Sequence, residues 1–205
     1  MKRLLCLLCV VFATMVASAQ ITWNAKAGLG MALCTGEGLE MESKLVGRIG
    51  VGLEKPLSSN WSLMPSLEFA MKGAKFDESD GDYSYSENVS FCYIQVPILA
   101  AYRLNLSDSW NMVVKAGPYL AYAVSGNADA SYSEGGYSES ESVDVFDDEM
   151  GGKRFDLGLD LAVDFECRRY VFGLEFEKGF TSIIDQEYGD KVVNAAAYVT
   201  VGYKF

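Results

Sequence analysis

Hydrophobic and polar residues alternate along most of the chain, most clearly over residues 193–205. In this segment the odd positions carry only Val, Ala, Tyr and Phe, and the even positions are mostly polar or small. A period of two is typical of a β-strand with one apolar and one polar face. In lipid both backbone edges of such a strand must be paired, so we expect it to close a ring by pairing with the first strand of the chain.

Eight segments show this alternation, and they are separated by turn-forming residues. The connections alternate between long and short, which is typical of an up-and-down barrel with short periplasmic turns and long outer loops. The sequence therefore predicts an all-β fold, an eight-stranded antiparallel transmembrane β-barrel with both termini on the periplasmic side. A barrel of this size is just wide enough for side chains to fill, so we expect a plugged lumen. The predicted strands are residues 22–33, 45–55, 61–76, 90–104, 110–124, 154–167, 170–180 and 193–205.

The first 19 residues have the three parts of a secretory signal peptide. Lys2 and Arg3 are basic, residues 4–16 are apolar, and Ala17-Ser18-Ala19 is a cleavage signal. We expect a signal peptide of residues 1–19 and a mature barrel of residues 20–205. Beyond this leader no apolar run approaches the ~20 residues of a spanning helix.

Charged residues recur on the face that the alternation points inward. An Arg or Lys side chain facing the middle of the bilayer costs about 2–4 kcal/mol. A one-residue slip of a strand would turn all of its inward charged side chains toward lipid, so we expect the register to be well specified. Paired carboxylates can perform acid–base chemistry, but neutralisation by inward Lys and Arg is the favoured interpretation. The predicted lumen charge network is Lys26, Arg48, Glu54, Glu68, Lys72, Arg103, Lys115, Asp156, Asp160, Asp164, Glu175, Glu177 and Lys204.

Aromatic residues gather at the predicted strand ends, where rings prefer the boundary between lipid and water. A periplasmic girdle is expected from Trp23, Trp61, Trp110, Tyr102, Phe165, Tyr170, Tyr203 and Phe205. An opposite girdle is expected from Phe76, Phe91, Tyr122, Phe155 and Phe180.

Three prolines lie inside predicted strands, although a closed barrel has no free edge to accommodate them. We expect β-bulges or missing ladder bonds at Pro65, Pro97 and Pro118.

Several motifs resemble the outer-membrane β-barrel family that includes PorT-like proteins. They are Lys26-Ala27-Gly28-Leu29, Leu67 with Lys72-Gly73-Ala74-Lys75-Phe76, Tyr93-Ile94-Gln95-Val96-Pro97-Ile98-Leu99 with Tyr102, Ala116-Gly117-Pro118-Tyr119-Leu120, Arg154-Phe155-Asp156-Leu157-Gly158 and Gly202-Tyr203-Lys204-Phe205. The resemblance implies an eight-stranded barrel and links the family's name-giving member to a secretion and gliding system. It assigns no residue of this chain to that role.

Composition narrows the function. The net charge of −11 becomes −13 without Lys2 and Arg3, and so acidic a surface argues against nucleic acid as a partner, because phosphates need Lys or Arg. The chain has no histidine, which argues against an enzyme, and we expect no catalytic residue, cofactor or metal.

Neither the acidic residues near Gly81 nor the cysteines of the mature chain indicate a binding or catalytic site. The acidic residues around Gly81 (Asp77, Asp80 and Asp82) do not match the spacing of an EF-hand calcium loop. The three cysteines of the mature chain, Cys34, Cys92 and Cys167, are expected to be unpaired.

The leading hypothesis is a non-enzymatic barrel of a gram-negative outer membrane that displays long acidic loops. The expected partners are outer-membrane lipid and lipopolysaccharide, the barrel-assembly machinery at the C-terminal strand, and an extracellular or secretion-system protein. Three alternatives stay open: a PorT-like accessory of a secretion or surface-assembly system, a narrow channel, and a soluble lipocalin-like barrel.

Overall fold

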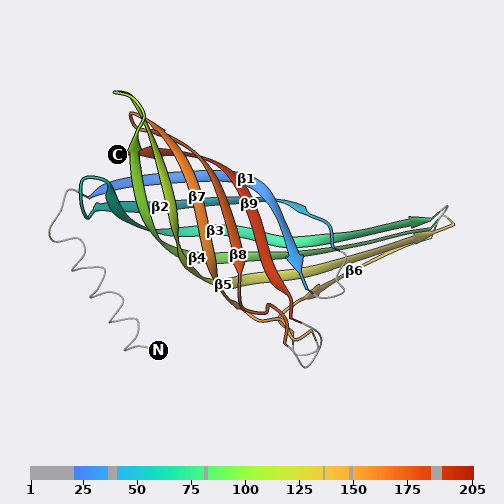
Figure 1. Ribbon diagram of the computed structural model, residues 1–205. Coiled ribbons are helices and arrows are strands. Elements are labelled where there is room, and N and C mark those ends of the chain that lie inside the picture. The colour runs from blue at the N-terminus through green and yellow to red at the C-terminus, as the bar shows by residue number, and fades with distance from the viewer. Residues whose placement is uncertain (1–20, 37–40, 81–82, 136, 148–149, 186–190) are drawn as a thin grey trace.

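A computed structural model describes residues 21–36, 41–80, 83–135, 137–147, 150–185 and 191–205 of the chain (Figure 1). The predicted signal peptide lies outside these residues. No helix in the described ranges is long and apolar enough to cross a membrane. The described residues contain nine strands: β1 (Thr22–Thr35), β2 (Lys44–Pro56), β3 (Trp61–Asp80), β4 (Tyr83–Asn105), β5 (Trp110–Glu134), β6 (Tyr137–Asp144), β7 (Phe155–Cys167), β8 (Tyr170–Gly179) and β9 (Val193–Lys204).

Eight of the nine strands close a ring. Each strand pairs antiparallel with its neighbours in the order β4, β3, β2, β1, β9, β8, β7, β5, and β4 pairs with β5 to complete the ring. The closure runs from Asn24 opposite Lys204 to Thr35 opposite Val193. The predicted pairing of the last strand with the first is therefore confirmed, as is the all-β barrel fold.

The strand count exceeds the prediction by one, β6, and two segments expected to be loops are largely strand. Residues 77–88 belong largely to β3 and β4, and the expected loop of residues 125–153 contains the end of β5 and all of β6. Within the part of the chain that the structure describes, β6 pairs only with β5. These strands are polar on both faces, so they lack the apolar alternation that marks a strand beside lipid.

The additional strand length forms a four-stranded sheet that projects from the barrel at the end opposite the C-terminus (Figure 1). We call it the extension. It comprises residues 75–80 of β3, residues 83–90 of β4, residues 126–134 of β5, and β6.

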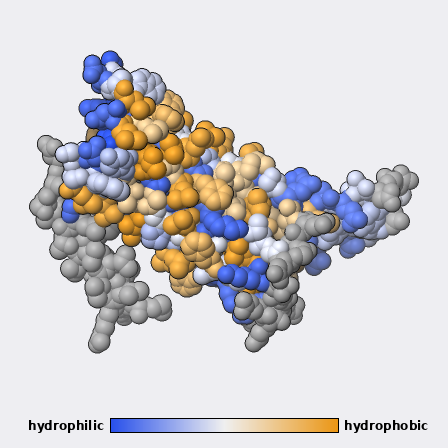
Figure 2. Space-filling model, in the orientation of Figure 1, coloured by the Kyte–Doolittle hydropathy of each residue, from blue (hydrophilic) through white to orange (hydrophobic). Residues whose placement is uncertain are grey.

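Apolar side chains cover the outside of the ring. On β7, Leu157, Leu159 and Leu161 are 45%, 36% and 43% exposed, whereas Asp156 and Asp160 are fully buried. Figure 2 shows apolar residues across the barrel and polar residues over the extension. The predicted register is therefore confirmed. The lipocalin-like alternative is wrong, because it requires the apolar face to point inward.

The residue pairing is interrupted at all three prolines, as expected. Among the described residues, pairing skips Pro65 on the side of β2, Pro97 on the side of β3 and Pro118 on the side of β4. Proline cannot donate a ladder hydrogen bond, so the ring tolerates a local gap at each site.

A glycine lies where β3 leaves the barrel. Gly73 has φ = 148°, and a Cβ atom there would lie 2.1 Å from the carbonyl oxygen of Val89. Only a residue without a side chain fits this close approach of β3 to β4.

The outward register makes a quantitative prediction. Leu161→Arg, at the middle of β7, should lower the free energy of unfolding by about 2–4 kcal/mol, because the charge would face hydrocarbon. Ser138→Arg on β6 is the control and should change it by less than about 0.5 kcal/mol. Reversible guanidinium titration in lipid vesicles measures both; equal effects would contradict the register.

Candidate functional site

The lumen is filled by layers of charged side chains, and the first layer lies beside the short turns. The Lys204 ammonium lies 2.7 Å from Glu54, and the Arg103 guanidinium lies 2.7 Å from Glu54 and 3.3 Å from Glu166. Lys204 also pairs with Glu166, and the Ser62 hydroxyl donates to Glu54 at 2.9 Å. Two carboxylates thus face two cations, drawn from β2, β4, β7 and β9.

Arg48 is the centre of the second layer. Its fully buried guanidinium pairs with Glu68, lies 2.7 Å from Glu175 and 2.9 Å from Glu177, and sits 4.7 Å from the Tyr198 ring centroid. A guanidinium suits this position because its several donors can satisfy more than one carboxylate.

Two lysines complete the second layer. The Lys26 ammonium lies 2.9 Å from both Glu68 and Glu175. The Lys115 ammonium lies 2.7 Å from Asp164 and 3.5 Å from Glu175. Glu175 therefore contacts three cations from three different strands, which ties β1, β2 and β5 to β8.

The third layer combines ions with neutral polar groups. The Lys72 ammonium lies 2.9 Å from Glu177, 3.6 Å from Asp156 and 4.0 Å from the Tyr119 ring centroid. Asp156 also accepts hydrogen bonds from the Tyr119 hydroxyl at 3.1 Å and the Asn194 amide at 3.0 Å.

Asp160 is the exception in this network. It is fully buried, yet among the described residues neither of its carboxylate oxygens has a hydrogen-bond partner, and it takes part in no ion pair there. Asp156 and Asp164, the neighbouring inward aspartates of β7, have cationic partners. Neutralisation by Lys and Arg therefore holds for these two carboxylates and not for Asp160. In all, eight lumen carboxylates face six cations.

The free space in the lumen is small. A cavity of about 30 Å³ lies among Lys26, Asp164, Lys204 and their neighbours, which is room for roughly one water molecule. Apart from Asp160, the lumen carboxylates contact Lys or Arg side chains.

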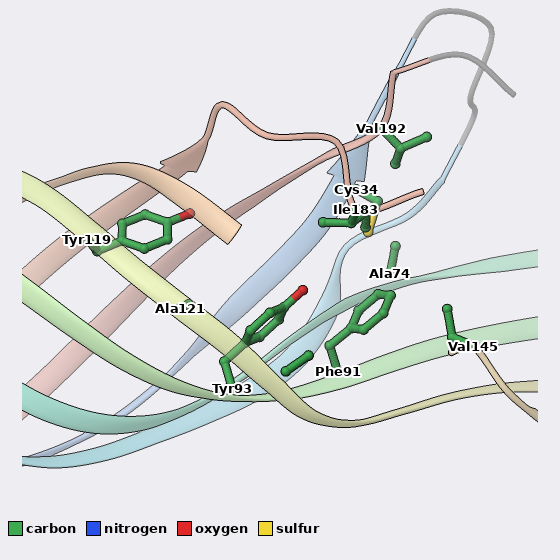
Figure 3. Close-up of a cluster of buried hydrophobic side chains, with 10 residues drawn as sticks. Cys34, Ala74, Phe91, Tyr93, Tyr119, Ala121, Val145, Ile183 and Val192 are labelled. Atoms are coloured by element: carbon green, nitrogen blue, oxygen red, sulfur yellow. The ribbon is translucent and has the colours of Figure 1, made fainter. Parts of the chain in front are cut away.

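A cluster of buried apolar residues lies at the extension end of the lumen, and we call three of its members, Val145, Ile183 and Val192, the apolar cap. These residues pack against Cys34, Ala74, Phe91, Tyr93, Tyr119, Ala121 and Ala123 (Figure 3). Backbone hydrogen bonds join the cap segments: Gly152 donates to Val145 at 3.0 Å, Lys153 to Ile183 at 2.8 Å, and Ile183 to Val192 at 2.8 Å.

Sequence reasoning missed the cap because its residues lie between predicted strands, in segments assigned to loops. The available signal was the presence of aliphatic residues in otherwise polar segments, at Val143 and Val145 and at Ile183 and Ile184. In a water-exposed loop such residues have no reason to recur.

The prediction that Phe91 belongs to the second aromatic girdle is wrong. It is 1% exposed and belongs to the apolar cluster below the cap, because odd residues of β4 point inward. Tyr122, Phe155 and Phe180 are exposed on the outside, at 44%, 61% and 55%. Phe76 lies partly buried on the extension.

The other predicted girdle lies around the short-turn end. Ring contacts join Trp61 to Tyr102 at 5.0 Å, Tyr170 to Tyr203 at 5.5 Å, and Tyr203 to Phe205 at 5.5 Å between centroids. Seven of the eight side chains are exposed and Tyr203 is partly so: Trp23, Trp61, Trp110, Tyr102, Phe165, Tyr170, Tyr203 and Phe205. Their role at a membrane interface stays a prediction.

The two faces of the extension differ in chemistry. Strand register places Glu78, Tyr85, Tyr132 and Glu139 in one row across the four strands, and Phe76, Glu87, Ala130 and Glu141 in the next. With Tyr83 and Tyr137 beyond them, these residues form what we call the tyrosine–glutamate face.

The opposite surface is the serine–aspartate face, whose rows are Asp77, Ser86, Ser131 and Ser140, then Ser79, Ser84, Ser133 and Ser138, then Lys75, Asn88, Asp129 and Ser142. Its carboxylates have partners: Ser86 donates to Asp77 and Ser142 to Asp129, both at 2.6 Å.

The pKa shifts of side chains on the two faces reflect their different neighbours. Hydrogen bonds from Lys75 and Ser86 lower the pKa of Asp77, and the charge of Glu87 raises the pKa of the Tyr85 phenol. Asp77 and Asp80 lie on β3, whereas Asp82 lies outside the described residues. No group of three or more metal-ligating side chains occurs within the described ranges. Cys34, Cys92 and Cys167 are free thiols.

Comparison with solved structures gives matches at low sequence identity. Ail, the attachment invasion locus protein of Yersinia pestis, is 16% identical with a TM-score of 0.43, and the match covers 91% of this chain and all of Ail. Neisserial surface protein A is 12% identical with a TM-score of 0.46, covering 91% of this chain and 98% of the other. OprG from Pseudomonas aeruginosa is 8% identical with a TM-score of 0.45, covering 90% and 95%.

Comparison with protein families gives one extended match. Residues 18–185 match the family described as outer membrane protein beta-barrel domain. No curated protein matches the chain.

The lumen network predicts unequal effects of two matched substitutions. Glu175→Gln breaks ion pairs with three cations and should lower the free energy of unfolding by about 3–5 kcal/mol. Asp160→Asn removes the same charge where no cation pairs with it, so it should leave stability unchanged or raise it. Denaturant unfolding in lipid vesicles compares them, and a larger loss for Asp160→Asn would show that the ion pairs are misassigned.

Proposed function

The chain belongs to the outer membrane protein β-barrel domain family, and from this premise we propose that it displays its acidic extension to a partner outside the membrane. The single observation that carries the proposal is the extension itself. Three barrel strands continue beyond the apolar belt and β6 joins them. Together the four strands carry nine acidic residues against one lysine: Asp77, Glu78, Asp80, Glu87, Asp129, Glu134, Glu139, Glu141 and Asp144, with Lys75. A solvated sheet of this length is not needed to close a barrel.

The orientation follows from the general plan of outer-membrane barrels. Such barrels have short periplasmic turns and longer external loops. In our proposal the termini and the turn at Arg168 and Arg169 are periplasmic, and the extension and cap are external. Lipid and lipopolysaccharide surround the apolar belt, and the barrel-assembly machinery recognises β9.

The lumen supports a non-conducting, non-enzymatic barrel. Charged side chains, most of them ion-paired, occupy the described interior, and apolar residues lie at its extension end. Water and ions would have to displace groups that are bound to one another across the ring. The resemblance to PorT-like proteins stays a prediction, because none of these features favours a secretion role.

The packed lumen predicts the absence of a channel. Purified protein in planar bilayers should give no stable conductance, because the cap and the three charged layers block the path. An open porin in the same bilayers serves as the positive control. A large, steady conductance would refute the plugged lumen and leave the display proposal to be tested separately.

Display is tested by removing the half of the extension that the end of β5 and β6 form. Asn127 lies opposite Asp144, so residues 128–143 can be replaced by an Asn-Gly turn that leaves Val145 of the cap in place. Cells with this variant should lose binding to the external partner. The barrel should still fold, as shown by heat-modifiable migration on a gel.

The control variant carries Ser133→Ala, which leaves the extension intact, and should bind as the parent does. If the shortened protein folds and cells bind as before, display is not its function.

A further inference from the structure

The carboxylates of the two faces of the extension differ in how they are satisfied. On the serine–aspartate face, Asp77 pairs with Lys75 at 2.7 Å, and Asp129 accepts from Ser142. Asp144 accepts from the backbone NH of Phe146 at 2.9 Å. The single cation of the extension, Lys75, also lies on this face and is shared with Glu42 at 3.2 Å. Each of these three carboxylates therefore already has an ion-pair or hydrogen-bond partner.

The carboxylates of the tyrosine–glutamate face have weaker partners than those of the serine–aspartate face, or none among the described residues. Among the described residues, Glu78 and Glu141 have no ion-pair or hydrogen-bond partner. Glu87 and Glu139 accept only long hydrogen bonds from tyrosine hydroxyls, at 3.4 Å from Tyr85 and 3.5 Å from Tyr137. These carboxylates are the ones left to attract a cation from outside.

Aromatic rings lie between these carboxylates. Tyr83 and Tyr132 are 5.6 Å apart between ring centroids, and Phe76 and Tyr85 are 6.3 Å apart. Their π faces attract guanidinium and ammonium groups by about 0.5–1 kcal/mol each at exposed sites. In the row Glu78, Tyr85, Tyr132 and Glu139, two rings are flanked by two carboxylates, so a cation above the rings also meets a negative charge.

We propose that the tyrosine–glutamate face is a docking surface for an extended, cationic polypeptide segment, whose Arg or Lys side chains lie over the tyrosine rings and pair with the glutamates. The inference rests on the proposed display function and specifies its surface and partner chemistry. Charge complementarity selects a basic partner and disfavours nucleic acid or a second copy of this acidic face. Same-face residues along a strand repeat at roughly 6.6 Å, which matches alternate side chains of an extended peptide.

The test uses the whole protein in zwitterionic nanodiscs and a fluorescent peptide of alternating Arg and Ser. Binding is measured by fluorescence anisotropy at low and moderate salt. The parent should bind this peptide and should not bind a matched peptide of alternating Glu and Ser. Failure to bind the basic peptide at low salt would overturn the inference.

Two variants that remove the same number of charges distinguish binding at the tyrosine–glutamate face from attraction by the overall negative charge of the extension. Glu78→Gln with Glu139→Gln should weaken peptide binding about fivefold or more, whereas Asp129→Asn with Asp144→Asn should weaken it less than about twofold. Tyr85→Ser with Tyr132→Ser should weaken it as the glutamate variant does. Circular dichroism and heat-modifiable migration confirm that each variant folds. Equal weakening by both charge variants would reduce the interaction to diffuse electrostatics and overturn the docking surface.

The outcome is distinguishable from failure of display. Cells that lose partner binding when residues 128–143 are removed, but keep it in the glutamate and tyrosine variants, would support display and overturn this inference. Cells that keep partner binding without residues 128–143 would overturn display, whatever the peptide does in vitro.

Discussion

The structure depends on one constraint: in a closed ring the side-chain alternation of every strand must agree, because one side meets hydrocarbon and the other meets ions. The ring has no open strand edge only if β1 pairs with β9. Once the ring closes, charges on six cations and eight carboxylates are confined together, away from bulk water. Their mutual pairing then fixes the register of each strand, since a slip would expose them to lipid.

The same constraint explains the layers above and below the central network. Arg48 and Glu175 draw charges from several strands into one cluster, and Lys72 links it to the tyrosines beneath the cap. Beyond the apolar belt both faces of the sheet meet water. Side-chain chemistry there is no longer set by lipid, and serine, tyrosine and acidic residues replace leucine and valine.

The barrel was predictable because every strand beside lipid needs apolar residues on its outer face and admits charged residues on its inner face. Alternation alone predicts that Leu157 faces outward and that Asp160 and Lys204 face inward. The prolines within strands predict the positions where backbone pairing is interrupted. The extension was not predictable, because YSYSEN and YSESESVD alternate between two polar classes that both suit water. The lone position of Asp160 and the inward packing of Val145 depend on which strands face each other across the lumen, which alternation does not encode.

Side-chain orientation along β7, in a protein reconstituted in vesicles, tests the account most directly. Single cysteines at residues 157–164, in a background where the three native cysteines of the barrel are serine, would carry spin labels. Oxygen, which dissolves in lipid, should relax labels at the odd positions strongly and at the even positions weakly, with a period of two. Strong relaxation at the even positions, or no period at all, would contradict an apolar exterior around an ionic lumen.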